Sequence, residues 1–169
     1  MRALNRLILA IAATTVLMAP ARLHATPRAG QTAPVLKITT TSGQPVSLDT
    51  YRGRVLVLDF FATWCRPCRD SIPHLNEMTR KFGKQGLQVL GISVDDGGER
   101  AVKHFAEQYH ITYPIALAGE TTLADFGVRS VPMVFVIDKK GTVTDVFRGF
   151  NGDVGRSAEQ LIKKLLAEK

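Results

Sequence analysis

Residues 55–69 have the sequence VLVLDFFATWCRPCR, and this stretch decides the architecture of the chain. The run from Val55 to Phe61 is apolar apart from Asp59, which predicts a strand buried on both faces. Cys65 and Cys68, the two cysteines of the chain, follow directly, and a helical pattern begins after them. We therefore predict a central strand, a tight turn and a helix, with both sulfur atoms at or near the helix N-terminus.

The spacing of the two cysteines favours redox chemistry over a structural crosslink. A disulfide between residues three apart restricts the unfolded chain very little, so it adds little stability. A helix N-terminus favours the thiolate form of Cys65, and the positive charge of Arg66 acts in the same direction. Pro67 suits the first helical turn, where its missing N–H has no partner in any case.

Strands and helices alternate on both sides of this stretch. A short hairpin is predicted before it, over residues 37–48, with Ser42-Gly43 at the turn. After it we predict helix 65–82, strand 87–94, helix 99–109, strand 111–117 and helix 121–126, and then hairpin 133–147 and helix 154–168. Pro73 is expected to kink or divide the first of these helices. The pattern predicts an α/β domain with a mixed central sheet and helices on both of its faces.

The N-terminal 25 residues have the pattern of a secretory signal peptide, with Arg2 and Arg6 before an apolar stretch and small residues at its end. We expect cleavage after Ala25; an uncleaved membrane anchor is the alternative. Residues 26–34 are expected to form a mobile leader, and residues 35–169 a single domain.

Composition argues against a nucleic-acid-binding protein and against a small protein held together by disulfides. Residues 1–25 contain three of the 22 Lys and Arg residues and none of the 15 acidic residues, so the charge balance after export falls from +7 to +4. No run of like charges is interleaved with aromatic residues, which argues against nucleic acid as a partner. A single cysteine pair is also too sparse for a disulfide scaffold, so an apolar core must stabilise the domain.

Three segments resemble the thioredoxin superfamily, and within it the exported TlpA/ResA-type thiol-disulfide oxidoreductases. They are Leu58 to Arg69, Gly91 to Asp95, and Gly127 to Asp138, in the same order as in that family. The resemblance runs from about Gln31 to the C-terminus. It implies a thioredoxin fold with an N-terminal β-hairpin extension and a central helix-strand insertion near residues 96–117.

The resemblance also implies site residues. Cys65 would be the nucleophile and Cys68 the resolving thiol, with Trp64, Arg66 and Pro67 around them. Val131-Pro132 would be a cis peptide bond facing the cysteines, and a client peptide would pair with the backbone of Val131 as a short added strand. An ordinary trans proline at the start of a strand is the alternative.

Two positions depart from the family pattern. An acid is common six residues after the first cysteine, where this chain has Ser71. Proton transfer would then fall to Asp59, although the lysine that often accompanies such an aspartate is replaced by Gly91. We expect the apolar setting to raise the pKa of Asp59. A structural aspartate paired with a neighbour is the alternative role.

The leading functional hypothesis is an extracytoplasmic or periplasmic enzyme that exchanges disulfides through Cys65 and Cys68. The resemblance favours reduction of client proteins such as apocytochrome c or copper-site proteins, with electrons from a membrane thiol-disulfide donor. We expect a monomer with no cofactor beyond the Cys65–Cys68 pair. Two alternatives stay open: a thiol peroxidase of the peroxiredoxin type and a copper-binding metallochaperone. No metal site is expected, because the histidines lack the paired spacing of a zinc site.

Overall fold

The computed structural model describes residues 25–168. The predicted signal peptide and anchor therefore lie outside the described residues, apart from Ala25. The elements in chain order are β1 (Lys37–Thr39), β2 (Pro45–Ser47), the 3-10 helix η1 (Leu48–Tyr51), β3 (Val55–Phe61), α1 (Arg66–Phe82), the 3-10 helix η2 (Gly83–Gln85), β4 (Leu87–Ser93), α2 (Gly98–Gln108), β5 (Ile115–Leu117), α3 (Glu120–Asp125), β6 (Met133–Ile137), β7 (Val143–Arg148) and α4 (Gly152–Ala167).

A mixed sheet of five strands forms the centre of the molecule, in the order β5-β4-β3-β6-β7. Strand β3 lies in the middle, parallel to β4 and antiparallel to β6. All seven of its residues are buried, as the apolar run predicted. The register places Asp59 opposite Gly91 on one side and Val134 on the other. The active-site stretch thus grows from the most protected strand of the fold.

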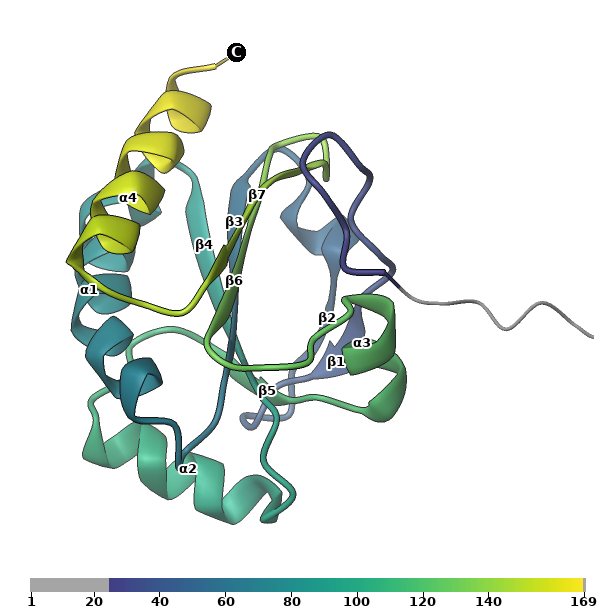
Figure 1. Ribbon diagram of the computed structural model, residues 1–169, viewed down its shortest axis with the longest axis vertical. Helices are drawn as coiled ribbons and strands as arrows, with labels where there is room; N and C mark the ends of the chain where they lie inside the picture. The colour runs from purple at the N-terminus through teal and green to yellow at the C-terminus, as the bar shows by residue number, and fades with distance from the viewer. Residues whose placement is uncertain (1–24, 169) are drawn as a thin grey trace, which may run out of the picture.

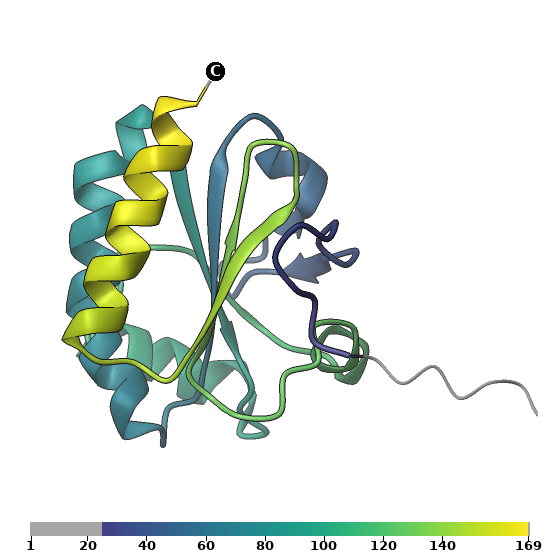
Figure 2. The same cartoon turned by 45° about the horizontal axis from the view of Figure 1, so that its top comes forward.

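Helices α1 and α4 lie together on one face of this sheet (Figures 1 and 2). Successive strand residues point to opposite faces, so Val55, Val57, Asp59 and Phe61 all point to this side. Val55 and Val57 pack in one cluster with Leu75, Met78 and Phe82 of α1 and with Ile162 and Leu165 of α4. Burial of this apolar stripe fixes α1, and with it the cysteines, against β3.

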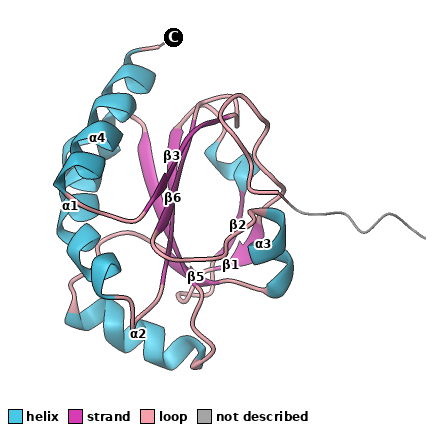
Figure 3. Cartoon of the chain, viewed as in Figure 1, coloured by secondary structure: helices cyan, strands magenta, loops and turns pink. Residues whose placement is uncertain are grey.

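The opposite face carries α3 and the β1-β2 hairpin (Figure 3). Leu56, Leu58 and Phe60 of β3 form its core with Phe126 and Phe135, and the hairpin adds Ile38 and Val46. The aromatic rings of Phe60, Phe126 and Phe135 lie 5.3–5.7 Å apart between centroids. The fold is therefore layered as predicted, with helices on both faces and an N-terminal hairpin. Segment α2-β5 forms the expected central insertion.

Pro73 does not divide the first helix, contrary to one part of the expectation. Helix α1 runs from Arg66 to Phe82 with Pro73 inside it. Proline in a helix interior costs about 3 kcal/mol. The buried apolar residues on either side, Ile72 and Leu75, pack against the sheet and hold both halves in one helix.

The segment expected to be a mobile leader, residues 26–34, is docked on the domain, so that expectation is corrected. Pro27 is buried, and the Thr26 hydroxyl donates a hydrogen bond to the Gly127 carbonyl (2.9 Å). The backbone N–H of Gly30 donates to Val143, whose own N–H donates to Gln31 (both 2.8 Å). Because the segment pairs with the start of β7, its backbone groups are satisfied as in a strand. Among the described residues, no helix combines the length and apolarity needed to cross a bilayer.

Candidate active site

Cys65 and Cys68 form a disulfide at the start of α1, with an S–S distance of 2.04 Å. Cys65 is the N-cap residue of the helix, and its sulfur accepts a hydrogen bond from the backbone N–H of Cys68 (3.2 Å). Cys65 keeps 5% of its surface exposed, whereas Cys68 is fully buried. An incoming disulfide can therefore reach only the Cys65 sulfur. The predicted placement at a helix N-terminus is confirmed.

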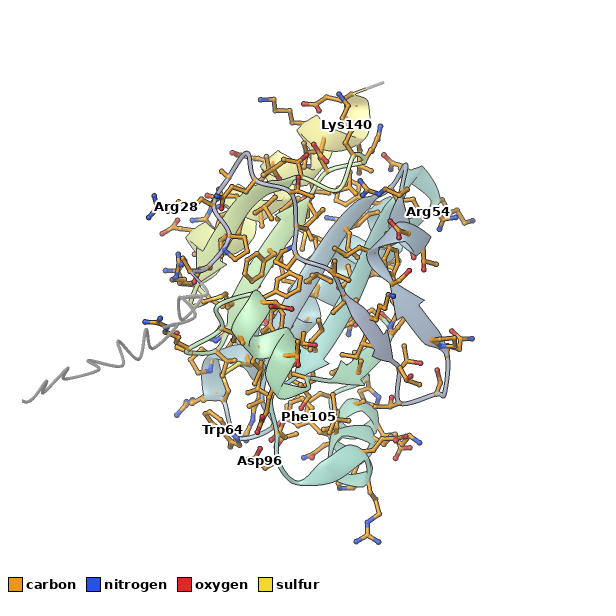
Figure 4. All side chains as sticks on the ribbon, turned by 90° about the vertical axis from the view of Figure 1, so that its right-hand side faces the viewer. Arg28, Arg54, Trp64, Asp96, Phe105 and Lys140 are labelled. Carbon is orange, nitrogen blue, oxygen red and sulfur yellow. A yellow bond between two sulfur atoms is a disulfide. The ribbon has the colours of Figure 1, made fainter. Side chains whose placement is uncertain are left out.

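The residues around the cysteines differ in how far they extend into solvent. Arg66 and Pro67 occupy the exposed first turn of α1, where Pro67 lacks only an N–H that would have no helical partner. Trp64 has 67% of its surface exposed, which places it on the rim of the site rather than in the core. It lies at the same end of the molecule as Asp96, and Lys140 lies at the opposite end (Figure 4).

Asp59 lies beneath α1, on the same face of β3 as Val57 and Phe61. Phe61 packs in a cluster with both cysteines and Ile72, and Val57 packs with Leu75. Asp59 is thus placed under the first turns of the helix. It is 1% exposed, and neither carboxyl oxygen has a hydrogen-bond partner within residues 25–168. Burial raises the pKa of Asp59 to about 7, in the direction that the sequence predicted.

The site lacks a lysine beside Asp59 for a steric reason. Gly91 is the cross-strand partner of Asp59. A Cβ atom at Gly91 would lie 3.1 Å from Phe61 Cε1 and 3.2 Å from Tyr113 Cε2. Those contacts are tighter than ordinary van der Waals separations, so a long side chain does not fit there without repacking. Sequence reasoning identified Gly91 but missed Tyr113, which fills the space over it.

Asp95 fixes the loop that precedes the cysteines. Its carboxylate accepts hydrogen bonds from the Thr63 backbone N–H (2.9 Å), the Thr63 hydroxyl (2.6 Å) and the Ser93 hydroxyl (2.7 Å). Arg69 secures the same loop from α1 by donating to the Thr63 carbonyl (2.8 Å). The N-cap residue of α2 is Gly97, so the Asp95 side chain serves the loop before the cysteines rather than the start of α2.

Replacing Asp95 with asparagine is expected to lower the free energy of unfolding of the oxidised protein by about 2 kcal/mol. The amide takes the place of one acceptor oxygen, and hydrogen bonds to a charged group are worth about 1.5–3 kcal/mol. Urea unfolding measures the change. Asp96→Asn is the matched control, because the Asp96 side chain is exposed and surface changes stay within about 0.5 kcal/mol. Equal stability of the two variants would contradict the role given to Asp95.

The loop from Gly127 to Pro132 borders the cysteines from the other side. Its Val131–Pro132 peptide bond is cis, as the resemblance implied, and Pro132 is buried. Val131 packs against the cluster that contains Cys65 and Cys68. An open pocket of about 250 Å³ lies between this loop and Trp64. The residues lining it are Trp64, Val94, Leu123, Val128, Arg129, Ser130 and Val131.

Ser71 is buried under the active site but does not replace the missing family acid. Its hydroxyl donates to the Cys68 carbonyl (2.8 Å), a bond within α1. Asp59 is therefore the buried carboxyl on this face of the sheet. Over the described part of the chain, no three His, Cys, Asp or Glu side chains come together as metal ligands would. A copper-binding role would have to use the two thiols alone.

A dithiol at the start of α1, with one sulfur accessible and the other buried, can exchange disulfides with another molecule. Proteins with this chemistry on a thioredoxin fold are thiol-disulfide oxidoreductases, and the chain is an enzyme of this class. Comparison with known proteins supports the assignment. The chain belongs to the AhpC/TSA family, whose model matches residues 29–146.

The relatives carry names of the same class. Thiol-disulfide oxidoreductase ResA of Bacillus thuringiensis subsp. konkukian is 31% identical over 137 residues, which is 80% of this chain and 78% of ResA. Thioredoxin-like protein YneN of Bacillus subtilis is 32% identical over 71% of each chain. A crystal structure of a thiol:disulfide interchange protein of the thioredoxin family from Chlorobium tepidum has a TM-score of 0.73 at 28% identity, covering 85% of this chain and 99% of that one.

Proposed function

We propose that this oxidoreductase works outside the cytoplasm and reduces disulfides in client proteins. The observation that carries the proposal is the unequal burial of the two cysteines, with Cys65 accessible at the helix N-terminus and Cys68 enclosed. This arrangement assigns different steps to the two cysteines. The signal-like residues 1–25, with cleavage after Ala25 or retention as an anchor, support export.

The reaction has two exchange steps. The Cys65 thiolate attacks one sulfur of a client disulfide, so a Cys65–client disulfide forms and the client's other sulfur leaves as a thiolate. Cys68 then loses its proton to Asp59 and attacks the Cys65 sulfur. The client's second thiolate leaves, and Cys65 and Cys68 end as a disulfide. Two electrons have passed to the client, and no cofactor beyond the cysteine pair takes part.

A carboxyl with a pKa of about 7 suits the second step. It is partly ionised near neutral pH, so it can accept the Cys68 proton and later return it. Asp59 also opposes a strongly stabilised thiolate, because its negative charge lies under the same helix turn. A dithiol with a weakly stabilised thiolate is the better reductant, which favours the reducing direction despite the charge of Arg66. A membrane thiol-disulfide donor would restore the dithiol.

The pocket between Trp64 and Val131 suits an extended client segment. Its lining is mostly apolar, with Val94, Leu123 and Val128, and Arg129 adds a positive charge. A client chain lying beside Val131 would place its disulfide over Cys65, with Trp64, Arg66, Pro67 and Pro132 around it. Apocytochrome c and copper-site proteins are candidate clients of this kind. We propose that the enzyme meets them as a monomer.

Cys68→Ser is expected to accumulate as mixed disulfides with clients, because the first step proceeds and the second is blocked. Expressed with its own N-terminus, it is purified from the extracytoplasmic fraction without reductant, and the partners linked to Cys65 are identified by mass spectrometry. The double variant Cys65→Ser with Cys68→Ser is the control for adventitious binding. Recovery of linked partners only from the cytoplasm, or of none above the control, would contradict the proposal.

Two simple assays address the other activities open to a cysteine pair. A thiol peroxidase would consume hydrogen peroxide when reduced, and a metallochaperone would bind Cu(I) tightly while leaving insulin disulfides untouched. The residues before Cys65, Ala62-Thr63-Trp64, lack the proline of a peroxidatic site. We expect slow peroxide consumption and ready insulin reduction. Rapid peroxide turnover, or copper binding without insulin reduction, would overturn the assignment of direction and client.

A further inference from the structure

Among residues 25–168, Asp59, Tyr113 and Arg69 each have a buried polar atom without a hydrogen-bond partner. Arg69 uses another guanidinium nitrogen to donate to the Thr63 carbonyl, whereas Asp59 and Tyr113 have no side-chain hydrogen bond there. Both carboxyl oxygens of Asp59 and the hydroxyl of Tyr113 are enclosed, and none of them is hydrogen-bonded to any of residues 25–168. A buried polar group without a partner costs about 1–3 kcal/mol, so most such groups are paired. Two of them on neighbouring segments of one core call for a common explanation.

The two groups come together across Gly91. Asp59 and Gly91 are register partners on the parallel strands β3 and β4, and neighbouring strands lie about 4.7–4.9 Å apart. The Tyr113 ring covers Gly91, with Cε2 3.2 Å from the position of a Cβ atom there. Cε2 neighbours the carbon that bears the hydroxyl. Tyr113, from the chain before β5, therefore covers the glycine that pairs with Asp59.

The electrostatics agree with this placement. The pKa of Tyr113 is raised well above its ordinary value, first by burial and then by the negative charge of Asp59. The hydroxyl is therefore neutral across the working pH range and can act as a hydrogen-bond donor. The hydroxyl donates to none of residues 25–168, and the Asp59 carboxyl, whose charge acts on Tyr113, likewise lacks a hydrogen-bond partner there.

Within the part of the chain that the structure describes, the other elements around Asp59 supply no competing charge. Helix α1 contributes the two cysteines and Ser71, whose hydroxyl is bound to the Cys68 carbonyl. His74, further along α1, is hydrogen-bonded to the Gly155 carbonyl of α4 (2.9 Å). Strands β4 and β6 contribute Gly91 and Val134 at the paired positions. Tyr113 is thus the titratable side chain on which the Asp59 charge acts, and that charge raises the pKa of the Tyr113 hydroxyl.

We propose that Tyr113 is a positioning residue for the second exchange step. Its hydroxyl donates a hydrogen bond to the Asp59 carboxylate once that carboxyl has ionised, and holds it ready to accept the Cys68 proton. Tyrosine over glycine takes the place that a lysine beside the aspartate would occupy, but it supplies a neutral donor rather than a charge. The proposal rests on the proposed role of Asp59 and adds a residue to it.

Removal of the hydroxyl alone tests the proposal. In Tyr113→Phe the ring still covers Gly91, but the ionised carboxyl loses its donor, so its titration midpoint is expected to rise by about one pH unit. The midpoint is measured by carbon-13 NMR of the Asp59 carboxyl in the oxidised protein. Tyr51→Phe is the matched control, because Tyr51 packs on the opposite face of the sheet. A shift equal to that of the control would overturn the proposal.

A second substitution keeps both ring and hydroxyl. Incorporation of 3-fluorotyrosine at position 113 makes the hydroxyl a stronger donor, so the Asp59 midpoint is expected to fall rather than rise. A packing effect alone would not move the midpoint in opposite directions for the two replacements. Shifts of the same sign, or no shift in either, would overturn the proposal even if one variant were less stable.

Kinetics separate this inference from the proposed function. With 5,5′-dithiobis(2-nitrobenzoate), the second thionitrobenzoate released from the reduced protein reports the attack by Cys68. The rate of this release is expected to fall at low pH as Asp59 becomes protonated, and this fall is the acid limb of the pH profile. Tyr113→Phe is expected to move the acid limb to higher pH by about one unit. Asp59→Asn is expected to abolish it. If Asp59→Asn left the limb in place, the role of Asp59 would fail. If Asp59→Asn removed it and Tyr113→Phe left it unshifted, only the role of Tyr113 would fail.

Discussion

Replacement of Cys65 by serine is expected to reduce the rate of insulin disulfide reduction, above the background of the reductant, by at least about a thousandfold. Removing the nucleophile of an enzyme that uses covalent catalysis has effects of this size or larger. Serine is un-ionised near neutral pH and cannot form the mixed disulfide. Cys68 cannot take over, because it is fully buried. The measurement is the onset of insulin precipitation with dithiothreitol as electron source.

Cys68→Ser is the informative comparison for this result. It lacks the same disulfide, so any general loss of stability affects both variants. It nevertheless keeps the accessible sulfur, and we expect one mixed disulfide per molecule to form in an initial burst before turnover stops. Equal bursts from the two variants, or more than a tenth of the wild-type turnover from Cys65→Ser, would contradict the assigned roles.

The second large effect concerns stability and pH, and it follows from the burial of Asp59. The folded-state pKa is about 7, above the ordinary value of 3.8 for an unfolded chain. Between these values the folded protein binds a proton that the unfolded chain has released. The contribution of Asp59 to stability is therefore fully present below pH 3.8, and it is lost as the pH rises toward and through 7.

The free energy of unfolding of the oxidised protein is thus expected to fall by about 3 kcal/mol from pH 5 to pH 9 through Asp59 alone. Urea unfolding across this range measures it. Asp59→Asn has no carboxyl to titrate, so its curve should lack this decrease. All other titratable groups are common to the two proteins, so the difference between the two curves isolates Asp59. Parallel curves would show that Asp59 is not a buried, shifted carboxyl.

The same variant has a kinetic consequence. An asparagine cannot accept the Cys68 proton, so resolution of the mixed disulfide is expected to be slower near neutral pH. An unchanged pH–rate profile together with a changed stability curve would leave Asp59 with a structural role only. The two measurements therefore distinguish a proton acceptor from a carboxyl that is merely buried.

Much of the fold follows from local pattern. The apolar run before the cysteines specifies a strand with both faces covered, and the observed β3 has the predicted end at Phe61. The apolar stripe of α1 specifies which side of the helix packs on the sheet. Expectations failed where a local rule competed with packing. Pro73 did not divide α1, and residues 26–34 were docked rather than free, because in both cases buried apolar side chains outweigh the local preference of proline or glycine.

The site divides in the same way. Local sequence is enough to predict one closely spaced cysteine pair after a buried strand, and an apolar environment for Asp59, because these are properties of neighbouring residues. The three-dimensional fold was needed to show which cysteine is accessible, that Asp95 secures the loop before Cys65, and that Tyr113 covers Gly91, the strand partner of Asp59. Thr63 and Asp95 are 32 positions apart and Gly91 and Tyr113 are 22 apart, and no periodicity within one segment encodes a contact between two segments.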